Sequence, residues 1–177
     1  NGRPAFPKKQ EMKEIQSCFG LVFQNFNLFP HFSVIKNITD APIRVQKREK
    51  EEVYEEAKKL LTKMGLADKA DAYPYQLSGG QQQRAAIARA LVQRARVLLA
   101  DEPIASLDPE SSRNVMETLR DLNQKDGLTV LVTLHQVDYA LSFCPRTIAL
   151  KHGRVVYDGP SAELTPAFLK RLYGTEC

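Results

Sequence analysis

The segment Leu77–Gln81, with the sequence LSGGQ, constrains the fold of this chain most strongly because it predicts where a helix starts and what meets its end. Ser78 followed by Gln81 is the capping-box pattern S-x-x-Q, in which each side chain bonds the backbone N–H of the other residue. Gly79 and Gly80 carry no side chains, so we expect a phosphate to reach the unpaired N–H groups at the positive end of the helix dipole. The motif therefore predicts a helix N-terminus that faces phosphate.

An apolar run that ends in two carboxylates follows this helix along the chain. Val97–Ala100 has the composition of a buried strand, and Asp101 and Glu102 come directly after it, before Pro103. Open parallel sheets bind ligands beyond the carboxyl ends of their strands. The run therefore predicts acid groups that are delivered to a ligand site.

The remaining pattern predicts an α/β core with a helical lobe inserted after the first strand. Apolar runs rich in β-branched and aromatic residues predict strands at 19–23, 97–101 and 129–134, and a hairpin formed by 147–150 and 155–157 around His152-Gly153. Helical spacing and capping signals predict helices at 33–40, 47–64, 78–95 and 108–127, with short helices from 160 onward. One strand, a long helical stretch and then alternating strands and helices are typical of that architecture.

Composition limits the classes of function. A chain of 177 residues that is 43% apolar can bury one sizeable core, so we expect one domain, or one domain with a lobe. The net charge of +4 is modest and basic residues alternate with acidic ones, as in 47–52, so we expect no nucleic-acid partner. Three widely spaced cysteines indicate free thiols in a reducing compartment. No apolar run approaches the roughly 18 residues of a membrane span, so association with a membrane would be peripheral.

Polar residues end three of the predicted strands. Gln24 follows the first strand, the pair Asp101-Glu102 follows the second, and His135 follows the third. If these strands are parallel neighbours, their ends share one edge of the sheet. Such an edge could hold a metal-bound triphosphate and a water molecule, although each residue alone also fits a structural role.

These motifs and their order resemble the ATP-binding subunits of ABC transporters over nearly the whole chain. The resemblance implies ATP and Mg²⁺ as cofactors, with Asp101 holding the metal, usually through water, and Glu102 polarising the attacking water. It also implies that Gln24 senses the metal and the water, and that His135 contacts the γ-phosphate. The implied fold is a P-loop NTPase-like ABC ATPase core, incomplete here, with an inserted helical lobe.

The same resemblance implies a head-to-tail dimer of ATP-binding subunits. Ser78, Gly79, Gly80 and Gln81 match the signature that contacts the γ-phosphate of nucleotide held by the opposite subunit, with an ordinary capped helix as the alternative. Asp108 lies in the loop that reaches the second subunit, and its position before a proline also predicts a simple helix N-cap.

One motif of the family does not occur in this sequence. The phosphate-binding loop G-x-x-x-x-G-K-[ST] is missing, and in the family it lies a few tens of residues before the glutamine at Gln24, which would place it upstream of Asn1. We therefore expect an N-terminally truncated ABC domain that does not turn over ATP as it stands. Its expected parts are a helical lobe at 25–95, a sheet-containing core at 1–24 and 96–160, and C-terminal helices at 161–177.

Two importer subfamilies share these patterns. The half from Gln24 to Arg89 resembles import ATPases for polar amino acids, whereas the half from Leu98 onward resembles phosphonate import ATPases, and the second match is longer. The resemblance implies membrane permease subunits as partners, a solute-binding protein as an indirect one, and a position on the cytoplasmic face of the inner or plasma membrane. The aromatic segment Phe26–Phe32 is the expected permease contact. A non-catalytic remnant and a soluble, non-transport ABC ATPase are the alternatives.

Overall fold

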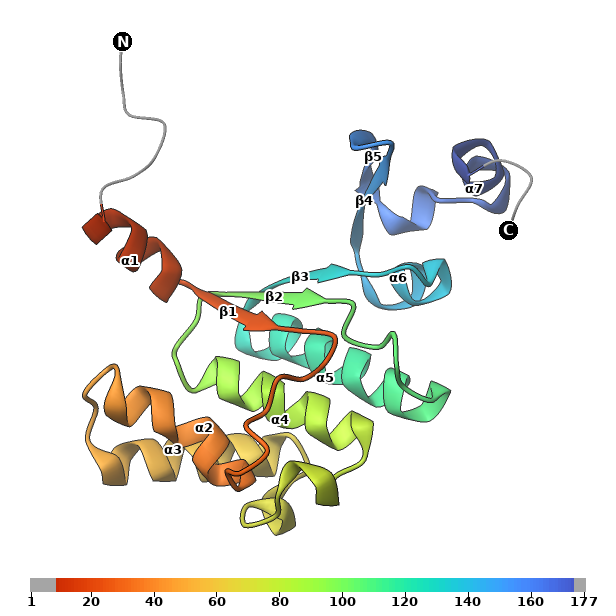
Figure 1. Cartoon of the computed structure of the whole chain (residues 1–177). Coiled ribbons are helices and arrows are strands. Elements are labelled where there is room, and N and C mark those ends of the chain that lie inside the picture. Colours follow the sequence, from red (N-terminus) through yellow and green to blue (C-terminus); the bar gives the residue numbers. More distant parts are fainter. Residues whose placement is uncertain (1–8, 174–177) are drawn as a thin grey trace. The chain divides into compact units, whose positions relative to one another are not determined.

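The computed structural model describes residues 9–173 (Figure 1). Contacts between residues divide the chain into two compact units, Asn1–Thr133 and Leu134–Cys177, and each unit is described on its own. The first unit contains the predicted helical lobe together with three strands, so the predicted subdivision into lobe and core stays a prediction. Among residues 9–173, no helix has the length and apolar character that crossing a membrane requires.

The first unit alternates strands and helices around a small sheet. Its elements are α1 (Lys9–Ser17), β1 (Phe19–Val22), α2 (Val34–Arg44), α3 (Lys50–Lys63), α4 (Gly79–Leu91), β2 (Val97–Asp101), α5 (Pro109–Asp126) and β3 (Thr129–Thr133). Short 3₁₀ turns lie at Ala67–Lys69 and Pro74–Gln76. The predicted strands and the helices between them are confirmed, whereas α1 was not predicted.

The three strands form a parallel sheet in the order β1-β2-β3. In this register Val22 pairs with Ala100, and Asp101 pairs with Thr133. Helices α4 and α5 cover one face (Figure 1), and a Cβ added at Gly20 would lie 3.1 Å from the Cβ of Ala90, so glycine permits the close approach of α4 to β1. The strands of this parallel order deliver their carboxyl ends to one edge, as the sequence predicts.

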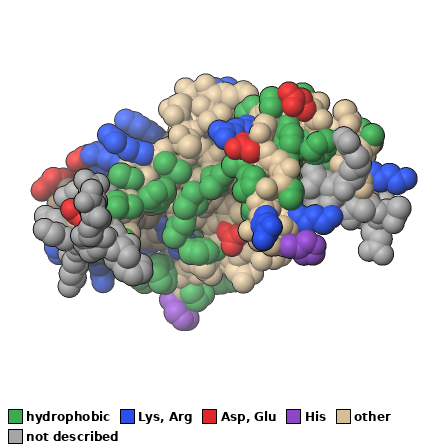
Figure 2. All heavy atoms as spheres, turned by 90° about the horizontal axis from the view of Figure 1, so that it is seen from above, with side chains coloured by type: hydrophobic (Ala, Val, Ile, Leu, Met, Phe, Trp, Pro, Cys, Tyr) green, Lys and Arg blue, Asp and Glu red, His purple; other side chains and the backbone are tan. Residues whose placement is uncertain are grey.

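The opposite face of this sheet is exposed in the first unit. Apolar side chains lie on this face, where Leu21 is 51% and Leu131 is 55% exposed. On the helix-covered face, by contrast, Val22 and Leu98 are buried. Figure 2 looks onto the molecule from this side and shows the apolar side chains gathered across its middle. An exposed apolar area of this kind is typical of a surface that contacts another segment or partner.

Two helix boundaries differ from the prediction. Helix α2 continues past Asp40 to Arg44, although Pro42 lies inside it and supplies no N–H to the helix. Helix α4 ends at Leu91, not at Ala95, because the chain turns at Arg94, which has a φ of 61° and whose N–H bonds the Leu91 carbonyl.

The second unit is built on a hairpin. Its elements are α6 (Val137–Phe143), β4 (Arg146–Lys151), β5 (Arg154–Pro160), a 3₁₀ turn (Ser161–Glu163) and α7 (Pro166–Tyr173). The turn at His152-Gly153 is confirmed, and both residues have positive φ, as tight hairpin turns require. Pro160 ends β5 and does not start a helix, which corrects the predicted boundary, and α6 was not predicted.

Candidate nucleotide site

The carboxyl end of β2 is joined to β3 through one hydroxyl group. Thr133 Oγ1 donates a hydrogen bond of 2.7 Å to Asp101 Oδ1 and accepts one of 2.9 Å from the backbone N–H of Glu102. The parallel pairing of Asp101 with Thr133 places the hydroxyl beside both groups. Thr133 therefore fixes the carboxylate of one candidate residue and the backbone of the next, although sequence analysis did not single it out.

Glu102 leaves the strand in an uncommon conformation. Its φ of 45° lies in the left-handed region, which non-glycine residues rarely adopt and which recurs in turns and at functional sites. The following turn closes through a 3.2 Å hydrogen bond from the Ala105 N–H to the Glu102 carbonyl, with Pro103 and Ile104 buried beneath it. The Glu102 side chain is half-buried, whereas Asp101 is exposed. Asp101 and Glu102, although adjacent in sequence, therefore differ in their exposure to solvent.

Gln24 lies at the same edge of the sheet, just beyond β1. Extending the pairing of Val22 with Ala100 by two positions sets Gln24 level with Glu102, and Gln24 is exposed. The loop that follows contains two residues with positive φ, Phe26 and Asn27. Gln24 and the two β2 carboxylates are therefore brought to one edge.

Helix α4 and helix α2 hold this loop from below. Arg89 donates hydrogen bonds of 3.1 Å and 2.6 Å to the carbonyls of Phe26 and Asn27. Asn37, only 2% exposed, accepts a 2.7 Å bond from the Phe29 N–H and donates to the Phe29 and Phe32 carbonyls. Neither Arg89 nor Asn37 was predicted, although a polar residue on the apolar face of a helix, as Asn37 is, signals such a role.

The signature segment starts α4 as predicted. Ser78 Oγ accepts the Gln81 N–H at 3.3 Å, and Gln81 Oε1 accepts the Ser78 N–H at 2.9 Å, so the capping box is confirmed. Gly80 has a structural reason to be glycine that was not predicted, whereas phosphate access at the two glycines stays a prediction. A Cβ at Gly80 would lie 2.8 Å from the Ser111 Cβ, and Gly80 is buried, so close packing against α5 requires a glycine there. Ser78 and Gly79 remain the more accessible part of this helix end.

Asp108 is the N-cap of α5, as its position before a proline predicts. Its Oδ1 accepts the Ser111 N–H at 2.9 Å. Hydrogen bonds from the Ser111 hydroxyl and N–H hold the pKa of the Asp108 carboxyl below its ordinary value. The carboxylate is exposed, so this capping role leaves it accessible to a second molecule.

His135 lies in the second unit, two residues beyond the end of β3. Its side chain is exposed. The edge formed by Gln24, Asp101 and Glu102 lies entirely within the first unit.

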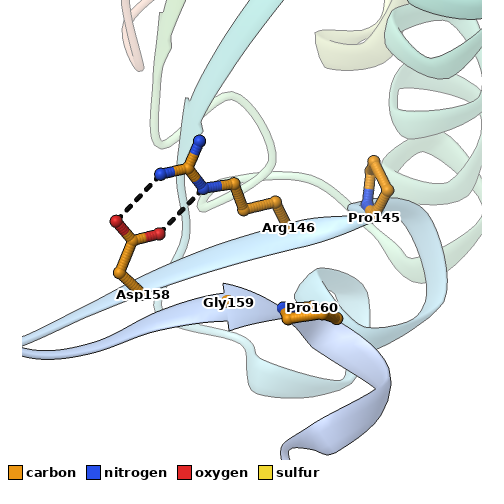
Figure 3. Close-up of a pocket in the computed structure, with 5 residues that line it drawn as sticks. All are labelled: Pro145, Arg146, Asp158, Gly159 and Pro160. Carbon is orange, nitrogen blue, oxygen red and sulfur yellow. Dashed lines mark hydrogen bonds and ion pairs between the residues drawn. The ribbon is translucent and has the colours of Figure 1, made fainter.

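The second unit has its own small hollow on the β4–β5 hairpin. Residues 145, 146 and 158–160 line a volume of about 380 Å³ (Figure 3). The Arg146 guanidinium donates two 2.8 Å hydrogen bonds to the Asp158 carboxylate, and this pairing raises the pKa of Arg146 and lowers that of Asp158. Because the two charges satisfy each other, the hollow offers little to a charged ligand.

The donor set at the β2 end suits magnesium. Among residues 9–173, no group of three or more His, Cys, Asp or Glu residues is arranged to bind a metal. Magnesium, however, takes oxygen ligands and retains several waters, so one carboxylate can hold it when phosphate oxygens complete the shell. Thr133 engages Oδ1 of Asp101 and leaves Oδ2 for a ligand.

A family model described as ABC transporter matches residues 2–105, and the chain belongs to this family. Among curated relatives, it is 52% identical over 185 residues to the phosphonates import ATP-binding protein PhnC of Paraburkholderia xenovorans, covering 99% of this chain and 62% of that protein. It is 50% identical over 173 residues to phosphonates import ATP-binding protein PhnC 1 of Pseudomonas aeruginosa, covering 94% and 62%. The chain thus spans about three-fifths of these relatives' length.

Solved structures confirm the α/β ABC ATPase fold. One is a dimeric post-hydrolysis state of the ATP-binding cassette MJ0796 bound to ADP and Pi, with a TM-score of 0.73, 36% identity, and coverage of 88% of this chain and 68% of that one. The other is cbiO1 from Clostridium perfringens, part of the ABC transporter complex cbiONQ, with a TM-score of 0.85, 27% identity and coverage of 96% and 68%.

Proposed function

We propose that this chain is part of the ATP-binding and ATP-hydrolysing subunit of an ABC importer that takes up phosphonates. The observation that carries the ATPase assignment is the fixed pair at the end of β2, where Thr133 bonds both Asp101 and the Glu102 backbone. The substrate assignment is supported by relatives near 50% identity that are named for phosphonate import. For this reason we propose phosphonates, and not polar amino acids, as the transported substrate.

In the proposed reaction, Asp101 would hold Mg²⁺, and Gln24 at the same edge of the sheet would act on the metal and the attacking water. When bound, Mg²⁺ neutralises charge on the phosphate oxygens. The water oxygen bonds to the γ-phosphorus while the bond from that phosphorus to the β–γ bridging oxygen breaks. Glu102 accepts the proton that the water loses. Thr133 holds the Asp101 carboxylate and the Glu102 backbone in place.

We propose that the site is completed by a second ATP-binding subunit. Helix α4 presents Ser78 and the Gly79 N–H at its positive end, where a γ-phosphate held by the other subunit would be stabilised. The Gln81 side chain completes the cap and Asp108 lies on the accessible start of α5. The dimeric MJ0796 cassette with ADP and Pi supports this arrangement.

We propose that the segment Phe26–Phe32 contacts membrane permease subunits at the cytoplasmic face of the membrane. Phe29 is 55% exposed and its ring centroid lies 5.3 Å from that of Phe32, so the two rings form an apolar anchor on a loop fixed by Asn37. A solute-binding protein would deliver the phosphonate to those permeases. The relationship to cbiO1, part of a transporter complex, supports a membrane partner.

The test uses the full-length gene product that contains this chain. We expect Mg²⁺-dependent ATP hydrolysis, and Glu102→Gln should retain ATP binding but lose turnover because the amide cannot take the proton. In cells, deletion of the gene should abolish growth on a phosphonate as the phosphorus source but not on phosphate. Hydrolysis by Glu102→Gln near the parental rate would reject Glu102 as the base, and growth on phosphonate after deletion would reject the substrate.

A further inference from the structure

A polar pocket lies where three helices of the first unit meet. The end of α3, the middle of α4 and one side of α5 line a volume of about 490 Å³. Pockets of this volume accommodate small molecules when a few polar groups converge on them. The pocket shares no residue with the edge formed by Gln24, Asp101 and Glu102, so the proposed ATPase reaction does not account for it.

The packing of α4 on α5 brings the lining side chains together. The two helices lie side by side and each leads into a strand of the parallel sheet, so they run in the same direction (Figure 1). Gly80 packs on Ser111 near their starts. Arg84, one turn beyond Gly80, therefore lies level with the second and third turns of α5, where Glu117 and Thr118 line the same pocket.

Arg84 is a half-buried cation without a counterion. Its Nε donates a 3.0 Å hydrogen bond to the carbonyl of Met64, the C-cap of α3, which holds the guanidinium group at the end of that helix. Within residues 9–173 Arg84 makes no other hydrogen bond and no ion pair. Burial lowers the pKa of Arg84, but arginine stays charged in proteins, and a buried charge without a partner is unfavourable. The terminal guanidinium nitrogens suit the oxygens of a carboxylate or a phosphonate.

Glu117 supplies the opposite charge in the same pocket. Its side chain is half-buried, and it has no hydrogen bond or ion pair in the part of the chain that the structure describes. Thr118 lies beside it and donates a 2.8 Å hydrogen bond to the Asn114 carbonyl, so the lone pairs of its hydroxyl oxygen can accept a further hydrogen bond. This side of the pocket therefore suits an ammonium group.

The other charged groups of the pocket are already paired. Lys125 donates a 2.7 Å hydrogen bond to Asp121, four residues earlier on α5. Lys63 pairs with Asp126 at the end of the same helix. One cation and one anion are thus left for a ligand, and a simple anion would meet the repulsive carboxylate of Glu117.

We propose that this pocket binds a small zwitterion, with Arg84 holding the anionic group and Glu117 the ammonium group. Aminoalkylphosphonates and amino acids share this chemistry, because both carry an ammonium group a few bonds from an anion. The site gives the subunit a ligand other than nucleotide, on residues that the ATPase reaction does not use. It goes beyond the proposed function and does not depend on it.

The test is calorimetric titration of the full-length protein with its nucleotide site filled by a non-hydrolysable ATP analogue, so that a phosphonate cannot occupy that site. The parent should bind aminoethylphosphonate about tenfold more tightly than ethylphosphonate, which has the same skeleton without the ammonium group. β-Alanine carries the same ammonium group on a carboxylate. Tighter binding of aminoethylphosphonate than of β-alanine would identify a phosphonate site, and the reverse order an amino-acid site; either order supports a zwitterion.

Glu117→Gln separates the two halves of the pocket. It should weaken binding of aminoethylphosphonate about tenfold but leave binding of ethylphosphonate unchanged or tighter, because a like charge has been removed. Glu110→Gln is the matched control, since this exposed glutamate lies on the same helix outside the pocket and should change neither affinity. Arg84→Met should abolish binding of all three compounds, and its melting temperature measures separately the loss of the bond to Met64.

Three results would overturn the inference. The first is a parent that binds neither zwitterion, as expected if Arg84 and Glu117 pair with each other in solution. The second is equal affinity of the parent for aminoethylphosphonate and ethylphosphonate, and the third is an equal effect of Glu117→Gln and Glu110→Gln. The proposed function is tested separately by ATP hydrolysis, so its failure would be distinguished from failure of this site.

Discussion

Replacing Thr133 by valine tests whether one hydroxyl organises the two carboxylates. The change keeps the shape and the strand preference of the side chain but removes both hydrogen bonds, the 2.7 Å bond to Asp101 and the 2.9 Å bond from the Glu102 N–H. After exchange with water, a hydrogen bond to a charged group contributes a net of about 1.5–3 kcal/mol to stability, and a neutral one about 0.5–1.5 kcal/mol. Thr133, Asp101 and Glu102 are all partly or largely exposed. In the absence of nucleotide, bonds to water can therefore replace much of the stabilisation that the two hydrogen bonds contribute.

We therefore expect Thr133→Val to change stability little but to reduce turnover. If about 2 kcal/mol of positioning is lost in the closed site, kcat falls about thirty-fold. The assay is steady-state ATP hydrolysis by the full-length protein across a range of Mg²⁺ concentrations. Thr133→Ser should restore most of the rate because it restores the hydroxyl.

The control is Thr129→Val at the other end of the same strand, where the exposed threonine pairs with Val97, far from the carboxylates. It should leave kcat unchanged. A Thr133→Val rate within about twofold of the parent, or an equal loss in Thr129→Val, would refute the positioning argument.

Three further outcomes are expected in the full-length protein. Ser78→Arg should leave ATP binding to each monomer intact but prevent ATP-driven dimerisation. Mixing it with Glu102→Gln should restore activity, because one of the two sites in the heterodimer then combines an intact Ser78 with an intact Glu102; heterodimers without activity would count against composite sites. Phe29→Ala with Phe32→Ala should weaken co-purification with the permease at unchanged basal hydrolysis, and unfolding of the double variant would show that these rings are core. Because the Ser111 hydrogen bonds lower the pKa of Asp108, the parent should be more stable than Asp108→Ala above the ordinary aspartate pKa of about 3.9. That advantage should disappear as the pH falls through the lower pKa of the folded state. The measurement is urea unfolding of the parent and of Asp108→Ala over a range of pH. A stability difference that does not change with pH would contradict the capping argument.

Much of the first unit is predictable because its signals are local. The capping box at Ser78, the N-cap at Asp108 and the apolar strand before Asp101 each depend on neighbours within a few residues, and all three occur as predicted. The hairpin turn at His152-Gly153 is equally local, since its positive φ values follow from the turn alone. Features of this kind need no knowledge of which elements pack together.

The features that were missed depend on contacts between distant segments. Thr133 acquires its importance only from the register that sets it beside Asp101, and Arg89 only from the approach of α4 to the loop at Phe26. Helix α1 has few apolar residues for a periodic signal, with a sequence of KQEMKEIQS. A sequence pattern cannot supply these, because pairing register and tertiary approach decide them.

The glycines of the signature illustrate why a correct motif can carry an incomplete reason. A bare helix end explains a need for small residues near phosphate, yet Gly80 is buried and packs on Ser111, whose N–H is capped by Asp108. The start of α4 and the start of α5 are therefore in direct contact, since any side chain at Gly80 would push the two helices apart. The Glu102 turn leads into α5, so the signature helix packs directly against the helix that follows the candidate base. Packing between two helices of one subunit is thus sufficient reason for glycine at position 80.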